Sequence, residues 1–160
     1  MKTKKDKTDL VVEAIGIISL TLLFLIPSYY YSQLPETIPI HFNLKGEADG
    51  FGSKDIIWLL SFIGLGTYLL INYLNKRPHL YNIPIKITKE NASKQYQLIS
   101  KMMRFFIAIT MQFLAYISYT TIQYALGNSK GLGGVSVVAY MLSILFVIAY
   151  YFYLAFKKSN

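Results

Sequence analysis

Four long apolar stretches limit what this chain can fold into. They cover approximately residues 10–31, 55–74, 102–126 and 135–156, and a helix needs about 20 apolar residues to cross a bilayer core. They lack the alternation of a membrane β-barrel, so helices are favoured. Hydrophobic residues make up 54% of the chain, which is too many for an ordinary soluble domain. The sequence therefore predicts an all-α integral membrane protein, a four-transmembrane-helix bundle in which residues 1–160 form a single membrane domain.

Basic residues are unevenly distributed over the connections, and cytoplasmic loops normally carry the excess. The basic residues of the connections at 32–54 and 127–134 are Lys45, Lys54 and Lys130 alone. We therefore expect these two connections outside, and both termini and residues 75–101 in the cytoplasm. We also expect the first span to be retained, because no A-x-A-like cleavage site follows it. The basic residues of the two tails are Lys2, Lys4, Lys5, Lys7, Lys157 and Lys158.

Charged residues of the spans are expected near the span ends. Glu13, Asp55 and Arg104 fall where snorkelling or the helix dipole can accommodate a charge. Proton pumps, ion-coupled transporters and intramembrane proteases normally hold ionisable groups deeper in the bilayer. This distribution therefore argues against those three classes.

Milder polar and small residues predict how the helices pack. Gln112 and its polar neighbours on the third span indicate hydrogen bonds between helices, which we favour, or a polar seam facing a substrate cavity. Ser61, Gly64 and Gly66 on the second span predict close helix packing. The third helix is expected to begin near Thr88, before its apolar part, because good helix formers follow that residue.

The chain lacks the residues that several kinds of chemistry require. The chain has no cysteine, which excludes disulfides, a thiolate nucleophile and a zinc–thiolate site. It also contains no nucleophile elbow, zinc motif or phosphate-binding loop. We therefore predict that the protein is not an enzyme and has no metal and no cofactor. The formal net charge of +8 sits beside the apolar stretches, which favours attraction to anionic lipid headgroups over nucleic acid.

The connection between the first two spans has a patterned sequence. Lys45-Gly46 and Asp49-Gly50 predict turns, in which glycine supplies a positive φ, so we expect a structured, hairpin-like cap. Its polar side chains have two interpretations that the sequence leaves open: a ligand site, or groups that satisfy the loop's own backbone. In an extended segment, alternation places Pro39, His41 and Asn43 on one face and Ile40, Phe42 and Leu44 on the other.

The same connection carries a family resemblance. The string Leu-Pro-x-x-Ile-Pro-x-His-Phe-Asn-x-x-Gly-x-x-Asp-Gly-Phe-Gly-Ser-Lys resembles the domain of unknown function 1648, found at the N-terminal part of bacterial SdpI-type immunity membrane proteins. The resemblance covers approximately residues 10–74. It implies a multi-pass protein of the bacterial cytoplasmic (inner) membrane. The best-understood member of that group protects its producer from a secreted toxic peptide and relays the peptide's presence to a repressor. The matching residues are Pro39, His41, Phe42, Asn43, Gly46, Asp49 and Lys54.

Two functional hypotheses follow. The first is ligand or peptide sensing, or immunity-like binding, through the outward residues 34–54, with those seven residues as the ligand-binding set. The alternative is a small transporter, or a subunit of a transporter or channel. The expected partners are the lipid bilayer, an extracytoplasmic peptide ligand, a cytoplasmic regulator and a second copy of the chain. Nucleic acid is not among them.

Overall fold

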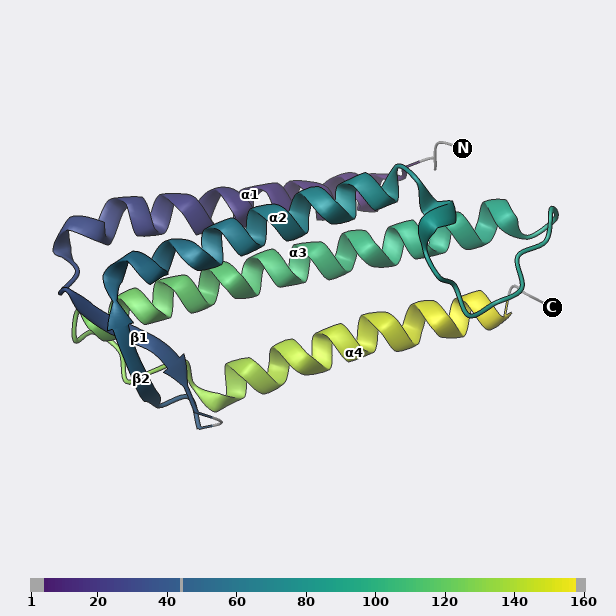
Figure 1. Cartoon of the computed structure of the whole chain (residues 1–160). Helices are drawn as coiled ribbons and strands as arrows, with labels where there is room; N and C mark the ends of the chain where they lie inside the picture. The colour runs from purple at the N-terminus through teal and green to yellow at the C-terminus, as the bar shows by residue number, and fades with distance from the viewer. Residues whose placement is uncertain (1–4, 44, 158–160) are drawn as a thin grey trace.

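Four long helices form the body of the molecule in the computed structural model, which describes residues 5–43 and 45–157 (Figure 1). They are α1 (Lys7–Tyr30), α2 (Ile57–Asn75), α3 (Ala92–Ala125) and α4 (Gly134–Lys157). All four are long and apolar enough to cross a membrane, which confirms the four predicted helices. Four residues used in the sequence-based predictions, Lys2, Lys4, Leu44 and Lys158, lie outside the described ranges.

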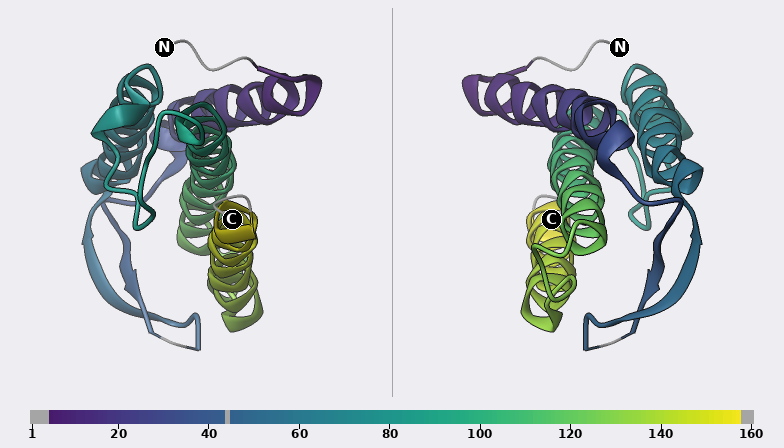
Figure 2. Two further views of the ribbon diagram at one scale, coloured as in Figure 1. Left: turned by 90° about the vertical axis from the view of Figure 1, so that its right-hand side faces the viewer. Right: turned by 90° about the vertical axis from the view of Figure 1, so that its left-hand side faces the viewer.

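Helix α3 is the centre of the bundle. Helices α1, α2 and α4 all pack on it, whereas α4 has its main helix contacts with α3 alone. Viewed along the bundle, α1 and α4 lie on different sides of α3 (Figure 2). As predicted, α3 is one continuous helix through its apolar part, but it begins at Ala92 rather than Thr88. Thr88 instead exchanges hydrogen bonds with Asn91, which form the turn before the helix.

Helices α1 and α2 approach closely at small residues of α2. The hydroxyl of Ser61 is buried and donates a hydrogen bond to the carbonyl oxygen of Leu23, at 2.7 Å. One turn later, a Cβ at Gly64 would lie only 2.5 Å from a methyl carbon of Leu23. The predicted close packing is confirmed at these two positions. Gly66 differs, since no heavy atom of the described residues would lie within 4 Å of a Cβ there.

The connection between α1 and α2 is a β-hairpin. Strands β1 (Thr37–Phe42) and β2 (Ala48–Ser53) pair antiparallel, with irregular register on both sides of His41. Short 3₁₀ turns, η1 (Tyr31–Gln33) and η2 (Lys54–Ile56), join the hairpin to the helices. The hairpin-like cap is therefore confirmed, while the all-α description omits these two strands.

Two details of the predicted loop are wrong. Asp49 and Gly50 lie inside β2 rather than in a turn, and Gly50 does not have a positive φ. The simple alternation also fails, because the register irregularity leaves Pro39 buried and Ile40 exposed. The glycines of β2 serve another purpose. A Cβ at Gly50 would lie 3.0 Å from the His41 Cβ, so the absence of a side chain leaves room for His41 of the facing strand.

The bundle has two distinct ends (Figure 1). The hairpin end holds β1, β2 and the turn at 127–133. The opposite end holds the start of α1, the 76–91 connection and the end of α4. The first and last helices thus have their outer ends on the same side, as an even number of spans requires.

The end opposite the hairpin contains an ionic cluster. The sequence predicts that snorkelling or the helix dipole accommodates Arg104, but its side chain is buried and reaches two acids of α1. Its guanidinium donates to Asp9 at 3.2 Å and to Glu13 at 3.0 Å. The pair with Asp9 is nearly closed to solvent, since both side chains are 5% exposed. Burial without such partners would be costly, so the pairing explains the position. The ionic cluster consists of Lys5, Asp6, Asp9, Glu13, Lys101 and Arg104.

The polar residues in the middle of α3 only partly bond to other helices, although Tyr116 donates to Ser136 of α4 at 2.9 Å. Thr120 donates to the carbonyl oxygen of Tyr116 in its own helix. Thr110 and Tyr140 of α4 make a long contact of 3.5 Å. Gln112 is exposed and borders an open groove between α3 and α4. The favoured interpretation of interhelical hydrogen bonds is therefore wrong for Thr120, and α3 packs mainly through apolar side chains.

Candidate functional site

The tip of the hairpin is docked on the turn between α3 and α4. The amide of Leu132 donates to the carbonyl oxygen of Gly46 at 2.9 Å. Gly46 has a φ of 81°, a conformation that L-residues with a side chain adopt at a cost. A Cβ at this position would also lie 2.6 Å from the amide nitrogen of Gly133. Both the turn and the close approach therefore require glycine at position 46.

Asn43 closes the hairpin turn. Its side-chain oxygen accepts hydrogen bonds from the amides of Lys45 and Glu47, at 2.9 and 3.1 Å. Its side-chain nitrogen donates to the Glu47 carboxylate at 2.9 Å. These are the local bonds that asparagine commonly makes in turns. At Asn43 the structure thus supports the interpretation in which a polar side chain fixes the loop.

Lys54 closes the open end of the hairpin. Its ammonium group lies 2.9 Å from the Glu36 carboxylate, and its amide donates to the Glu36 carbonyl oxygen at 3.0 Å. The same ammonium lies 5.3 Å from the centre of the Tyr31 ring, within the range of a cation–π contact. These contacts join the start of β1 to the end of β2.

Two further motif residues hold the hairpin against the helices. Pro39 is buried. The ring of Phe42 meets the ring of Tyr124, near the end of α3, edge to face with centroids 6.1 Å apart. Ile38, beside Pro39, belongs to a buried cluster with Ile122 of α3. Strand β1 is therefore a packed part of the bundle.

His41 and Asp49 form the exposed polar pair of the motif. The Nδ1 atom of His41 lies 2.5 Å from a carboxylate oxygen of Asp49 on the neighbouring strand. Their side chains are 70% and 44% exposed, which leaves room for a further partner. The structure thus brings His41 to Asp49 rather than to Asn43, the neighbour that the alternation predicted.

An apolar pocket lies beside this pair, between β1, the start of α2 and the later part of α3. Its volume is about 230 Å³. We call it the hairpin pocket. His41 and Thr121 supply its polar atoms, and Leu132 of the α3–α4 turn also contributes. The apolar side chains that line it from the helices include Ile56, Ile57, Leu60 and Ile117.

Sequence reasoning found only the hairpin part of this pocket. Ile117, Thr121 and Leu132 come from more than 60 residues further along the chain, and nothing in their local sequence marks them as pocket residues. From the sequence, Ile117 is predicted only to be an apolar residue of the third span. The pocket arises only from docking the hairpin on the end of α3.

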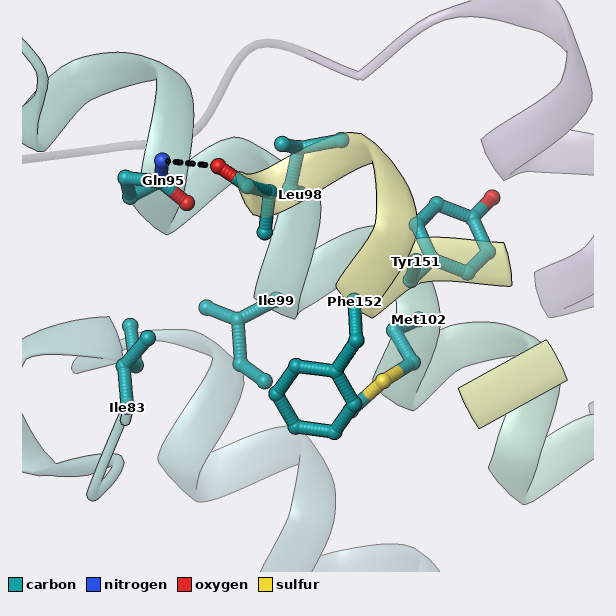
Figure 3. A pocket seen from close by; sticks show the side chains of 8 residues that line it. Ile83, Gln95, Leu98, Ile99, Met102, Tyr151 and Phe152 are labelled. Carbon is teal, nitrogen blue, oxygen red and sulfur yellow. Dashed lines mark hydrogen bonds between the residues drawn. The ribbon is translucent and has the colours of Figure 1, made fainter. Parts of the chain in front are cut away.

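Another cavity is too small for a ligand. It lies between the first part of α3 and the last part of α4, with a volume of about 20 Å³ (Figure 3), room for about one water molecule. Gln95 donates across it to the carbonyl oxygen of Ala155 at 2.9 Å, while the Gln95 side-chain oxygen has no partner among the described residues.

A metal site has no support within residues 5–43 and 45–157. That part of the chain contains no group of three or more histidine, aspartate or glutamate side chains placed to hold an ion. His41 and Asp49 would supply two ligands, fewer than structural sites normally use.

Comparison with known proteins agrees with the resemblance in the hairpin region. Residues 18–65 match a family described as "Domain of unknown function (DUF1648)". The chain is also 27% identical over 146 residues to an uncharacterised protein of Archaeoglobus fulgidus, covering 84% of this chain and 78% of that relative. No solved structure matches. The matched residues run from the middle of α1 through the hairpin to the middle of α2, so this unit is helix–hairpin–helix.

Proposed function

We propose that this membrane protein binds an extracytoplasmic ligand, of which a peptide is the best fit, through the hairpin pocket. One observation carries the proposal: an apolar pocket of about 230 Å³ lies next to the exposed His41–Asp49 pair. Apolar walls with a few placed polar groups are typical of ligand sites. An apolar side chain of a peptide would fill the pocket, and His41 and Asp49 would bond its backbone or a polar neighbour.

The rigidity of the hairpin supports binding. The tip is held by the bond between Leu132 and Gly46, the turn by Asn43 and the open end by Lys54. A site that is already ordered loses less conformational entropy when a ligand binds. In this account, Asn43, Gly46 and Lys54 are positioning residues, Pro39 and Phe42 form walls, and His41 and Asp49 contact the ligand.

The location of the site rests on the distribution of lysine and arginine. The connections at the hairpin end contain few basic residues, so the positive-inside rule favours the hairpin outside and both termini in the cytoplasm. The family resemblance favours a bacterial cytoplasmic membrane. Sensing or immunity to a secreted peptide would use such an outward site.

Peptide titration of the full chain in lipid nanodiscs tests the proposal. The probe is a synthetic amphipathic peptide with one phenylalanine, and the signal is the fluorescence of Trp58, the sole tryptophan. Trp58 packs on the buried cluster that contains Ile38 and Ile57, two pocket residues. We expect His41→Ala and Asp49→Asn to weaken binding about fivefold to tenfold, the effect of one lost hydrogen bond.

Two further variants make this test specific. Ile117→Phe adds volume to the pocket wall and should abolish binding. His79→Ala removes the other histidine, which lies exposed at the opposite end of the bundle, and should leave binding unchanged. Equal effects of His41→Ala and His79→Ala, or undiminished binding by Ile117→Phe, would refute the proposal.

Transport is a second candidate with weaker support. Gln112 borders an open groove between α3 and α4 rather than an enclosed path inside the bundle. A second copy of the chain would have to close that groove. Substrate flux in proteoliposomes that disappears with Gln112→Leu would favour transport over binding.

A further inference from the structure

A second, polar cavity lies at the end of the bundle opposite the hairpin. Its volume is about 330 Å³, and it is lined by the start of α1, the first turns of α3 and the last turns of α4. Lys94, Gln97 and Lys101 lie on one face of α3, at helical spacing. Tyr150 and Tyr151 of α4 bring aromatic rings with hydroxyl groups to the opposite wall. We call this space the ionic-end cavity.

One of the positively charged side chains around the ionic-end cavity has no acidic partner among the described residues. Asp9 is paired with Arg104, and Asp6 accepts a hydrogen bond from Lys101 at 2.6 Å. Lys94 is exposed and has no hydrogen bond or ion pair within residues 5–43 and 45–157. The ionic cluster itself is balanced, with three cations and three carboxylates. Lys94 adds a positive charge beside it, which favours an anionic ligand, and Lys94 is the group available to bind that ligand.

The walls of this cavity are held in place. The bond from Gln95 to the carbonyl oxygen of Ala155 ties the last turns of α4 to the first turns of α3 (Figure 3). Tyr151 packs on Met102 in a buried cluster, with its ring 6.1 Å from that of Phe105. The α4 wall of the cavity is therefore fixed against α3 by contacts that do not involve a ligand.

We propose that the ionic-end cavity binds the phosphate group of an anionic phospholipid. Lys94 would form the main ion pair, with the Gln97 amide and the tyrosine hydroxyls as neutral donors. Leu98 and Leu154 line the same space and supply the apolar surface that the start of an acyl chain needs. The cavity lies at the ends of three candidate spans, so it would meet the lipid headgroups of a bilayer that these helices cross.

This proposal differs from diffuse attraction of basic residues to a charged membrane. Diffuse attraction contributes similarly for each lysine near the surface. Binding at a specific site instead depends on the particular lysine that lines it. Lys89 provides the comparison, because it is exposed in the connection before α3 and does not line the cavity.

The test uses the full chain in nanodiscs of phosphatidylcholine, with or without phosphatidylglycerol, and native mass spectrometry of the protein with its retained lipid. We expect phosphatidylglycerol to be retained and Lys94→Gln to reduce its retention about fivefold. Lys89→Gln should retain the wild-type amount. Both positions are exposed, so neither variant is expected to unfold the protein.

Two outcomes would overturn the proposal. Equal losses for Lys94→Gln and Lys89→Gln would show diffuse attraction instead of a site. Glycerol phosphate at millimolar concentration, added to phosphatidylcholine nanodiscs, tests the source of the phosphate. If that soluble anion binds as tightly as the lipid and depends equally on Lys94, the ligand is a free phosphate compound and the lipid assignment is wrong.

Discussion

Arg104 illustrates how one buried charge constrains the position of a whole helix. Replacing it with methionine would leave the Asp9 carboxylate buried with its cation removed. We expect Arg104→Met to lower the free energy of unfolding by about 3 kcal/mol, the usual cost of breaking a buried pair. Lys101→Met removes a cation from the more exposed pair with Asp6 and should cost about 1 kcal/mol or less. Unfolding in mixed detergent micelles measures the free-energy loss of each variant. Similar losses for the two variants would contradict the difference between a buried and an exposed ion pair.

Gly46 offers a direct test of hairpin docking, because Gly127 is a matched control. Both glycines have nearly the same φ, 81° and 79°, so alanine should cost each about 1 to 2 kcal/mol in backbone strain. Only at position 46 would the new Cβ also meet backbone, 2.6 Å from the Gly133 nitrogen. Gly46→Ala should therefore destabilise the protein by about 1 kcal/mol more than Gly127→Ala. Equal losses in the same unfolding assay would mean that the tip is not docked.

Individual residue roles were only partly predictable from the sequence. The turn at Gly46 follows from local backbone chemistry. The position of Gly50 inside a strand does not, because its explanation is the His41 side chain on the facing strand. Arg104 was misjudged for a similar reason: its partners Asp9 and Glu13 lie about 90 residues earlier. Contacts between distant segments leave no signal in the local sequence.

At the scale of helices, the contact between α1 and α2 depends on Gly64. A Cβ there would lie 2.5 Å from the buried Leu23 side chain, so Gly64→Ala should destabilise the protein by about 1 to 3 kcal/mol. Gly66→Ala meets no heavy atom of the described residues and should stabilise α2 by up to about 1 kcal/mol, through helix propensity. The unfolding free energies of the two variants measure this contrast. A stabilising Gly64→Ala would contradict the packing described.

The start of α1 should depend on pH through Asp6. Asp6 caps the helix, and its hydrogen bond from Lys101 holds the pKa of its carboxyl below the usual value. A pKa lowered by folding means that Asp6 stabilises the protein above its unfolded-state pKa of about 3.9. This contribution is lost as the pH falls through the lower, folded-state pKa.

Asp6→Asn tests this pH dependence. The variant lacks the titrating group, so its unfolding free energy should change less than that of the wild type between about pH 5 and pH 2. Urea unfolding in detergent at stepped pH provides the measurement. Parallel pH curves for the two proteins would exclude a role for Asp6.

The elements were the most predictable level of the structure. Hydropathy alone located the four long helices, because a lipid-facing helix must be apolar over most of its length. The hairpin was foreseen from glycine and the extended pattern, but its register was not. A bulge changes which side chains are buried, and this one reverses the predicted exposure of Pro39 and Ile40.

At the scale of the whole molecule, the hairpin pocket and the ionic-end cavity lie at opposite ends of one bundle. The hairpin pocket shares Leu132 with the turn that leads into α4, and the ionic-end cavity is lined by the last turns of α4. Helix α3 lines both cavities, with Ile117 and Thr121 in the hairpin pocket and Lys94 and Lys101 in the ionic-end cavity. The proposals for the two cavities require them to face opposite sides of the membrane.

Cysteine accessibility tests that arrangement most directly, since the chain has no cysteine of its own. Phe51→Cys places a thiol on the exposed face of β2, and Lys89→Cys places one in the connection before α3. In intact cells, a membrane-impermeant maleimide should label position 51 and not position 89, and permeabilised cells should label both. Labelling of position 89 but not position 51 in intact cells would place the hairpin in the cytoplasm and contradict an outward binding site.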